Sequence, residues 1–212
     1  MKNIVEFLKK NYLLFIIIIC LVITGFILED VYEREILEFD KLAFSLFKIR
    51  TPLLTKIFLI ITNLGSPYVL IVLTLLSFLL KNKKLSFIIT GNLGLITIIN
   101  QVLKFIIKRP RPSDLFLIVE TGYSFPSGHS MVSLSFYGLL IYFIYKYFKN
   151  KKLKIFLITF LSLIIILIGI SRVYLGVHFV SDVISGFLLS LSYLIIFIKV
   201  INKFILKESY EK

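Results

Sequence analysis

The sequence predicts an all-α fold: an integral membrane six-helix transmembrane bundle with a small extracytoplasmic amphipathic element. Composition is the first observation that predicts it. Of 212 residues, 58% are hydrophobic and 17% are charged, and the mean hydropathy of +0.95 is too high for a soluble domain of this length. The second observation is that the apolar runs have the length of helices, about 20 residues for a hydrocarbon core about 30 Å thick, which excludes a barrel. The third is that lysines cluster between these runs.

Six apolar runs account for the predicted spans. The second run is short, and Gly65-Ser66-Pro67 separates it from a moderately apolar stretch at 52–62, so its upper boundary stays open. We expect one membrane-embedded domain over residues 1–212, with a motif-bearing core at about 85–198. The runs are Tyr12 to Leu28, Pro67 to Leu80, Leu85 to Ile107, Met131 to Tyr145, Leu153 to Ile170 and Phe179 to Ile198.

The first run resembles the apolar part of a signal peptide, because Lys9 and Lys10 precede it. No small-residue cleavage site follows, however, and acidic residues come next, so we expect a retained anchor helix. The sole cysteine, Cys20, lies inside this run, and its expected role is packing. The segment from Glu29 to Arg50 mixes apolar residues with charges, which favours an amphipathic element on the outer surface.

The net charge of +13 comes from 25 Lys and Arg against 12 Asp and Glu. A basic balance of this size can indicate nucleic-acid binding, but its distribution argues against that partner here. Fifteen lysines form four clusters between or outside the spans, accompanied by three acids, whereas nine acids fall on the other side. The positive-inside rule therefore places both termini in the cytoplasm, and an even number of spans agrees with termini on one side.

Three polar segments interrupt this pattern. One runs from Lys104 to Pro112 at the end of the third span, and the next, Tyr123 to Ser130, opens the fourth. The last, Ser171 to Asp182, joins the fifth and sixth. Because two crossings separate the second segment from the third, all three face the same extracytoplasmic compartment.

The residue types in these segments suit phosphate. Arg111 and Arg172 can each donate paired hydrogen bonds to phosphate oxygens, and Lys104 adds a compact positive charge. Backbone N–H groups at Ser127 and Gly128 can approach an anion at a helix start. We therefore expect these five residues to bind phosphate.

The remaining polar residues suit phosphoryl transfer. His178 and Asp182 are four residues apart, so they lie on one face if the sixth helix begins near Gly176. The carboxylate can accept the Nδ1 proton and leave Nε2 to attack phosphorus. His129 is then the expected general acid for the leaving group and the base that activates water. We expect no cofactor and no metal, because the three neighbouring cations would repel one.

Each segment taken alone also has a purely structural interpretation. The first can be a helix end stopped by prolines, the second a helix cap, and the third an ordinary surface pair four residues apart. Their conjunction on one face favours a shared site. A small transporter is the non-enzymatic alternative, but transporters place essential charges at mid-membrane, where these spans carry almost none.

The three segments resemble the signature of the type 2 phosphatidic acid phosphatase superfamily, which includes bacterial undecaprenyl-diphosphate and phosphatidylglycerophosphate phosphatases. The first motif, a lysine, six residues and Arg-Pro, is met by Lys104 with Arg111-Pro112. The second, Pro-Ser-Gly-His, is met at 126–129, and the third, Ser-Arg, five residues, His, three residues and Asp, at 171–182.

The resemblance spans roughly residues 40–198 and implies a metal-independent phosphohydrolase with His178 as nucleophile, His129 as acid and Asp182 as partner of the nucleophile. We expect it to remove phosphate from a lipid phosphate or diphosphate, with undecaprenyl diphosphate as the leading substrate. Phosphatidylglycerophosphate, phosphatidate and phosphotransfer to an acceptor are the alternatives. The expected partners are this lipid substrate and membrane lipids, and the sequence leaves the oligomeric state open.

Overall fold

The computed structural model describes residues 2–33, 36–47, 50–113 and 116–206. Within these ranges the chain forms helices and their connections and no strand, which confirms the all-α class. The elements are α1 (Lys2–Tyr32), α2 (Glu38–Leu46), α3 (Pro52–Asn63), α4 (Pro67–Ser77), α5 (Lys83–Ile107), α6 (Gly128–Tyr147), α7 (Lys151–Tyr174), α8 (Val180–Ile201) and the π-helical turn η1 (Asn202–Leu206).

Five helices of the described chain are long and apolar enough to cross a membrane by themselves: α1 from Asn11 to Tyr32, α5, α6, α7, and α8 continued by η1. The pair α3 and α4 passes the same test together, with a bend of 44° between the helices, and makes a sixth span if the two cross the membrane as one broken helix. The prediction of a second span at Pro67 to Leu80 was therefore too short. The 11 residues of α4 reach only about 16 Å, against a hydrocarbon core of about 30 Å.

The break between α3 and α4 follows from its sequence. Pro67 has no N–H to continue the helix and occupies the first turn of α4, where that N–H is not needed. The hydroxyl of Ser66 caps α4 by accepting from the Val69 amide at 3.4 Å. The Leu64 carbonyl next to the break accepts a hydrogen bond of 2.7 Å from the Tyr137 hydroxyl on α6, which satisfies it inside the bundle.

Two other predicted boundaries differ from the structure. The fifth span continues as α7 to Tyr174, so that Arg172 lies in a helix and not in a connection. The expected amphipathic element is shorter than Glu29 to Arg50, because α1 extends to Tyr32 and α2 begins at Glu38. Residues 34–35 and 48–49 of that stretch, and the lysines at 207 and 212, lie outside the described residues.

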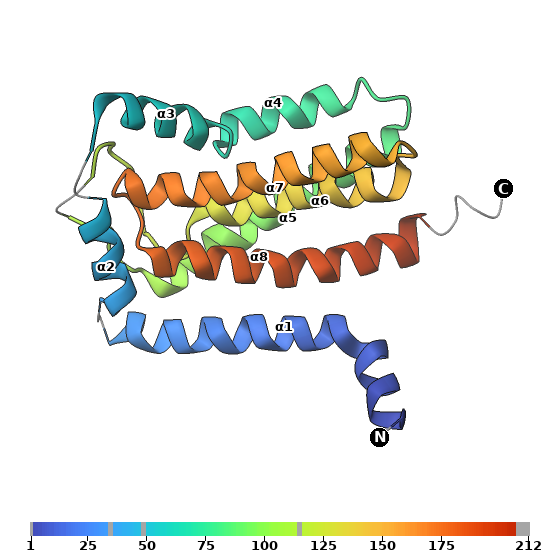
Figure 1. Ribbon diagram of the computed structural model, residues 1–212, viewed down its shortest axis with the longest axis horizontal. Helices are drawn as coiled ribbons and strands as arrows, with labels where there is room; N and C mark the ends of the chain where they lie inside the picture. Colours follow the sequence, from blue (N-terminus) through green and yellow to red (C-terminus); the bar gives the residue numbers. More distant parts are fainter. Residues whose placement is uncertain (1, 34–35, 48–49, 114–115, 207–212) are drawn as a thin grey trace.

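Helix α6 is central and packs against α5, α7 and α8, while α1 packs on α8, α3 on α7, and α4 on α5. Asn92 on α5 and Ser135 on α6 exchange two hydrogen bonds, of 2.9 and 3.2 Å, which join the two helices inside the bundle. Helix α2 lies across one end of the bundle, and the start of α1 and the end of α8 lie at the other (Figure 1).

Candidate active site

The three polar segments meet at the end of the bundle that α2 crosses. Helix α5 ends at Ile107 with Lys108 in the left-handed region at φ 54°, and Pro110 then prevents the helix from continuing. The chain returns to α6 at Gly128, while α7 ends and α8 begins beside it. This end of the bundle therefore combines the C-termini of α5 and α7 with the N-termini of α6 and α8 and a polar connection.

His178 and Asp182 form the expected pair. His178 Nδ1 lies 3.3 Å from Asp182 Oδ2, which also accepts the Phe179 amide at 3.0 Å. Helix α8 begins at Val180, later than expected, so that His178 belongs to the preceding turn, and the pair still forms. Both side chains are buried, with 1% and 0% of their surface exposed.

Arg111 determines the tautomer of His178. Its Nη1 lies 3.2 Å from His178 Nε2, and because a guanidinium can only donate, Nε2 must accept. The ring proton is then on Nδ1, facing Asp182. Arg111 is held there by three carbonyls, those of Val177 at 2.9 Å, Thr121 at 3.0 Å and Gly122 at 3.1 Å. The unprotonated nitrogen thus faces the guanidinium of Arg111, one of the residues that the sequence predicts to bind phosphate.

Burial holds the pKa of His178 well below its usual range, and the nearby charges of Arg172, Arg111 and Lys104 lower it further. The imidazole is therefore neutral at physiological pH. A neutral ring with a free Nε2 has the protonation state that a nucleophile requires.

Arg172 lies at the end of α7 and joins it to two other segments. Its Nη1 donates to the hydroxyl of Thr62 on α3 at 2.7 Å, and its Nη2 forms an ion pair with Glu120. Among the described residues, Arg172 Nε has no acceptor although it is buried. An oxyanion beside this guanidinium would supply one.

A cavity of about 800 Å³ collects these groups. Five of the eight predicted site residues line it, whereas Ser127, Arg172 and Asp182 are buried next to it. The Lys104 ammonium points toward the loop and donates to the Tyr123 carbonyl at 2.7 Å. Lining residues from the prediction are Lys104, Arg111, Gly128, His129 and His178.

His129 lies in the first turn of α6, against the break in the second span. A Cβ on Gly65 would lie 3.4 Å from His129 Cδ2 and 2.8 Å from Ile168 Cγ2, so only glycine fits there without displacement. Gly128 is similarly close to Asn100, whose amide donates to the Pro126 carbonyl at 3.2 Å. The start of α6 is therefore packed so closely at Gly65 and Gly128 that neither position has free space for a side chain.

The Ser127 amide makes a different contact from the one expected. It donates to the Asp182 carbonyl at 3.0 Å and so joins α6 to α8, while the Ser127 hydroxyl accepts from Ser130 at 2.9 Å. The Ser127 amide is therefore occupied in packing, because α8 approaches this turn closely at Gly186.

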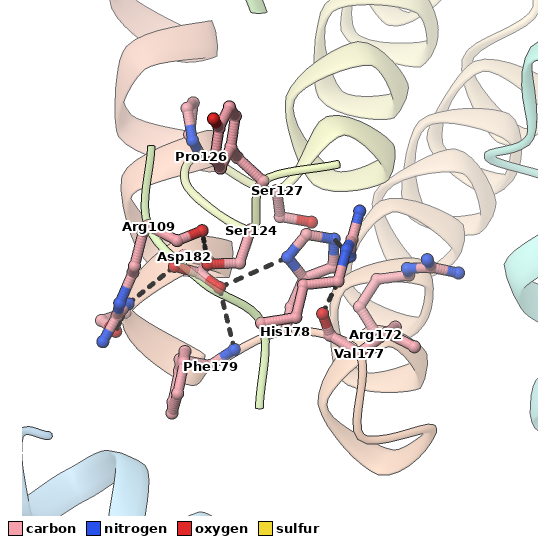
Figure 2. A network of polar contacts seen from close by, with 12 residues as sticks. Arg109, Ser124, Pro126, Ser127, Arg172, Val177, His178, Phe179 and Asp182 are labelled. Carbon is pink, nitrogen blue, oxygen red and sulfur yellow. Dashed lines mark hydrogen bonds and ion pairs between the residues drawn. The ribbon is translucent and has the colours of Figure 1, made fainter. Parts of the chain in front are cut away.

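Two site residues escaped the sequence analysis. Arg109 Nη1 donates to Asp182 Oδ1 at 2.6 Å, so that Asp182 lies between Arg109 and His178 (Figure 2). Asp40 on α2 is completely buried and lies 3.5 Å from Arg109 Nη2. A second arginine in Arg109-Pro110-Arg111-Pro112 was a signal for the first residue. Asp40 is one acid among many in its segment and gave none.

Within the described residues, no group of three or more His, Cys, Asp and Glu side chains lies in an arrangement that could hold a metal ion. Two cations and two imidazoles of the described residues line the cavity, those of Lys104, Arg111, His129 and His178, together with one carboxylate, that of Glu120. Such a set suits an oxyanion of the phosphate type.

Comparisons with known proteins bear on this arrangement. Residues 85–206 match the PAP2 superfamily. Phosphatidylglycerophosphatase B of Bacillus subtilis (strain 168) is 38% identical over 151 residues, which are 68% of this chain and 73% of that protein.

Two crystal structures are also similar. That of a transmembrane PAP2 type phosphatidylglycerolphosphate phosphatase from Bacillus subtilis gives a TM-score of 0.79 at 30% identity and covers 92% of this chain and 98% of its own. The structure of Aquifex aeolicus LpxE gives a TM-score of 0.63 at 29% identity and covers 75% of this chain and 93% of its own.

Proposed function

Because the chain belongs to the PAP2 superfamily and is a lipid phosphatase of that type, we propose that it dephosphorylates phosphatidylglycerophosphate through a phosphohistidine at His178. The observation that carries the proposal is the position of the His178 ring. Its Nδ1 faces Asp182, and its Nε2 faces Arg111 and the cavity.

In the first step, Lys104, Arg111 and Arg172 bind the phosphoryl oxygens, and Nε2 of His178 attacks phosphorus. Arg111 Nη1, which touches Nε2, turns to a phosphoryl oxygen as the substrate enters. The bond from phosphorus to the lipid oxygen breaks, and His129, which is protonated once the negatively charged phosphate lies beside it, gives that oxygen its proton. The phosphorylated ring carries positive charge, which Asp182 stabilises across the Nδ1 hydrogen bond.

In the second step, His129, now neutral, takes a proton from water. The resulting hydroxide attacks phosphorus, the bond to Nε2 breaks, and inorganic phosphate leaves. Each histidine is then returned to its starting protonation state, so the cycle needs only water and the lipid. Metal-independent turnover follows from this scheme.

The lipid tails leave the cavity between helices. Away from the histidines its walls are apolar and come from α4, α5 and α6, including Ile71, Leu93 and Val132. Phe105 and Ile106 line the same cavity and are 71% and 60% exposed on the bundle surface, where acyl chains of the bilayer would meet them. A head group at the histidines with tails toward the bilayer fits this shape.

The substrate choice rests on the relatives, two of which are named as phosphatases of phosphatidylglycerophosphate. Undecaprenyl diphosphate, expected from the sequence, stays a prediction that the same experiment tests. The distribution of lysines supports a site on the extracytoplasmic face with cytoplasmic termini.

The test is phosphate release by the purified protein in detergent with a chelator present. The substrates are phosphatidylglycerophosphate, phosphatidate, and undecaprenyl mono- and diphosphate. We expect phosphatidylglycerophosphate to give the highest kcat/KM, and His178→Ala to abolish release from all four. Full activity of that variant, or hydrolysis that requires added metal, would contradict the mechanism. A preference for another lipid would overturn the substrate alone.

A further inference from the structure

A buried chain of charged groups connects α2 to the nucleophile. Asp40 Oδ2 lies 3.5 Å from Arg109 Nη2, and Arg109 Nη1 donates to Asp182 Oδ1 at 2.6 Å. The other oxygen of Asp182 faces His178 Nδ1 at 3.3 Å. We call Asp40, Arg109 and Asp182 the charge chain. Asp40 lies outside the residues that match the superfamily, 85–206.

Asp40 also holds the backbone at the start of α8. Its Oδ1 accepts the Ser181 amide at 2.9 Å, and its Oδ2 accepts the Ser181 hydroxyl at 2.6 Å. Ser181 precedes Asp182 directly, and its hydroxyl accepts from Arg109 at 2.8 Å. A side chain 141 positions earlier in the sequence thus determines where the first turn of α8 lies.

A second contact between α2 and the site involves Phe179, the residue after His178. The ring of Phe44 on α2 packs edge-on against Phe179 with 5.5 Å between centroids. The guanidinium of Arg109 lies 4.0 Å from the centroid of the same ring. Residues 179 and 181 are therefore both held from the side of α2 and Arg109.

The net charge of the charge chain affects how well it can stabilise a positively charged His178 ring. Arg109 alone would neutralise Asp182, and a neutral pair would stabilise a cationic imidazole poorly. With Asp40 added, two carboxylates share one guanidinium, and the formal charge beside His178 is minus one when both carboxylates are ionised. All three are buried, with 0%, 6% and 0% exposed, so water screens this charge weakly.

We infer that Asp40 is a positioning residue for the nucleophile: through Ser181 and Arg109 it holds Asp182 against His178 and keeps the buried charge beside the ring negative. The inference rests on the lipid phosphatase activity. Asp40 touches neither the substrate nor His178. Its effect therefore reaches the phosphoryl transfer step through the other members of the charge chain.

A simple structural anchor for α2 would make the same contacts, so the test must separate the two roles. His178 faces charged or titratable groups from each element around it. None of them is altered by substitution of Asp40, which makes a change in the titration of His178 informative. These groups are Lys104 of α5, Arg111 of the following connection, His129 of α6, Arg172 of α7 and Asp182 of α8.

The experiment compares wild type with Asp40→Asn, in the full chain in detergent micelles, on the panel lipid that wild type hydrolyses fastest. The amide keeps the size of the side chain and removes its charge. We expect kcat to fall about 10- to 100-fold with KM changed less than about threefold, as for other losses of a group that orients a catalytic residue. The acid limb of kcat/KM should move to lower pH, because removing a negative charge disfavours the protonated ring.

Glu38→Gln is the matched control. Glu38 is on the same helix, 89% exposed, and pairs with Lys41 at its surface. The Glu38→Gln substitution removes one negative charge from α2, as Asp40→Asn does, but at a position outside the charge chain. We expect this variant to keep the wild-type kcat, KM and pH profile. Ser181→Ala removes the hydroxyl between Asp40 and Arg109 without changing charge, and we expect a smaller fall in kcat and no shift of the acid limb.

The outcomes are distinct. Wild-type kcat and pH profile in Asp40→Asn overturn the inference and leave the proposed function intact. A loss equal at every pH that matches a loss of folded protein in thermal unfolding assigns Asp40 an anchoring role only, and also overturns it. If Asp40→Asn does not fold, Ser181→Ala decides, because unchanged kcat there contradicts the link. No phosphate release by wild type from any lipid means that the proposed function itself fails.

Discussion

At the scale of single residues, the two arginines of the Arg-Pro-Arg-Pro stretch have opposite tasks. Arg111 faces the cavity, with its Nη1 on His178 Nε2, whereas Arg109 turns away from the cavity toward Asp182. One guanidinium is thus placed to bind phosphate and the other to bind the partner of the nucleophile. Pro110 between them has no N–H to donate and fixes the backbone that separates their directions.

Direct observation of the histidine rings tests the assigned tautomer. The chain has two histidines, so 15N spectra of histidine-labelled protein in lipid bilayers are assigned by a single His129→Ala variant. Because burial and cationic neighbours lower the pKa of His178, we expect its ring to be neutral at pH 6.5 and protonated on Nδ1. The ring should gain a second proton only at lower pH. If the His178 ring is half-protonated at a pH of about 6.5 or higher, its pKa is not below the ordinary value for histidine, and the prediction is contradicted.

Arg111→Lys tests whether the planar guanidinium is required. Lysine keeps the charge but cannot hold three carbonyls and bind two phosphoryl oxygens together. We expect kcat/KM to fall about 100- to 1000-fold, comparable to the loss of a group that stabilises transition-state charge. Lys108→Arg, at an exposed position beside the site, is the control. Near wild-type kcat/KM in Arg111→Lys would show that a point charge is sufficient.

At the scale of elements, the break in the second span brings three separate groups to the site. Thr62 before the break accepts from Arg172, and Pro67 after it lines the cavity. Gly65 within the break has no side chain, and a Cβ there would lie 3.4 Å from His129 Cδ2. A continuous helix would carry side chains into the space that His129 occupies. The bend therefore shapes the cavity wall next to His129, the predicted general acid.

Gly65→Ala tests this function of the break. The added methyl would lie 2.8 Å from Ile168 Cγ2 and 3.4 Å from His129 Cδ2, so a neighbour must move. We expect a loss of about 1 to 3 kcal/mol in stability from overpacking. Displacing His129 by about 1 Å should cost about 100-fold in kcat. Thermal unfolding and phosphate release measure the two effects.

Gly91→Ala on α5 is the control for that substitution, because nothing lies within 4 Å of its added methyl. Alanine also has a higher helix propensity than glycine, so we expect equal or greater stability and unchanged kcat. If both variants behave alike, the close approach at Gly65 has no role in catalysis.

At the scale of the whole molecule, the site and the lysine-rich α6 to α7 connection lie at opposite ends of the bundle. The orientation can be tested with single cysteines in a Cys20→Ala background. Val119→Cys lies in the exposed loop at the site, and Lys152→Cys lies at the other end. By the positive-inside rule we expect a membrane-impermeant maleimide to label position 119 in intact cells, and position 152 only after lysis. The reverse pattern would place the site in the cytoplasm.

Local sequence by itself determined the helical class, five of the span positions and the convergence of three polar segments. Hydropathy and lysine clusters act over one span at a time, and crossing parity then places distant segments on one face. The same local reasoning underestimated the second span, because Gly65 and Pro67 divide an apolar stretch whose first part, Pro52 to Asn63, is only moderately apolar. The catalytic roles of the predicted residues stay predictions for the experiments above.

Only the tertiary structure decided that Arg109 turns to Asp182 and that Asp40 is the acid that reaches this pair. Asp40 and Ser181 are 141 positions apart, and no periodicity connects them. The physical reason is that a buried charge must find its partners wherever packing places them, and that packing depends on how α2 crosses the bundle. Composition can show that acids are present in a segment, but the fold selects the one that becomes buried.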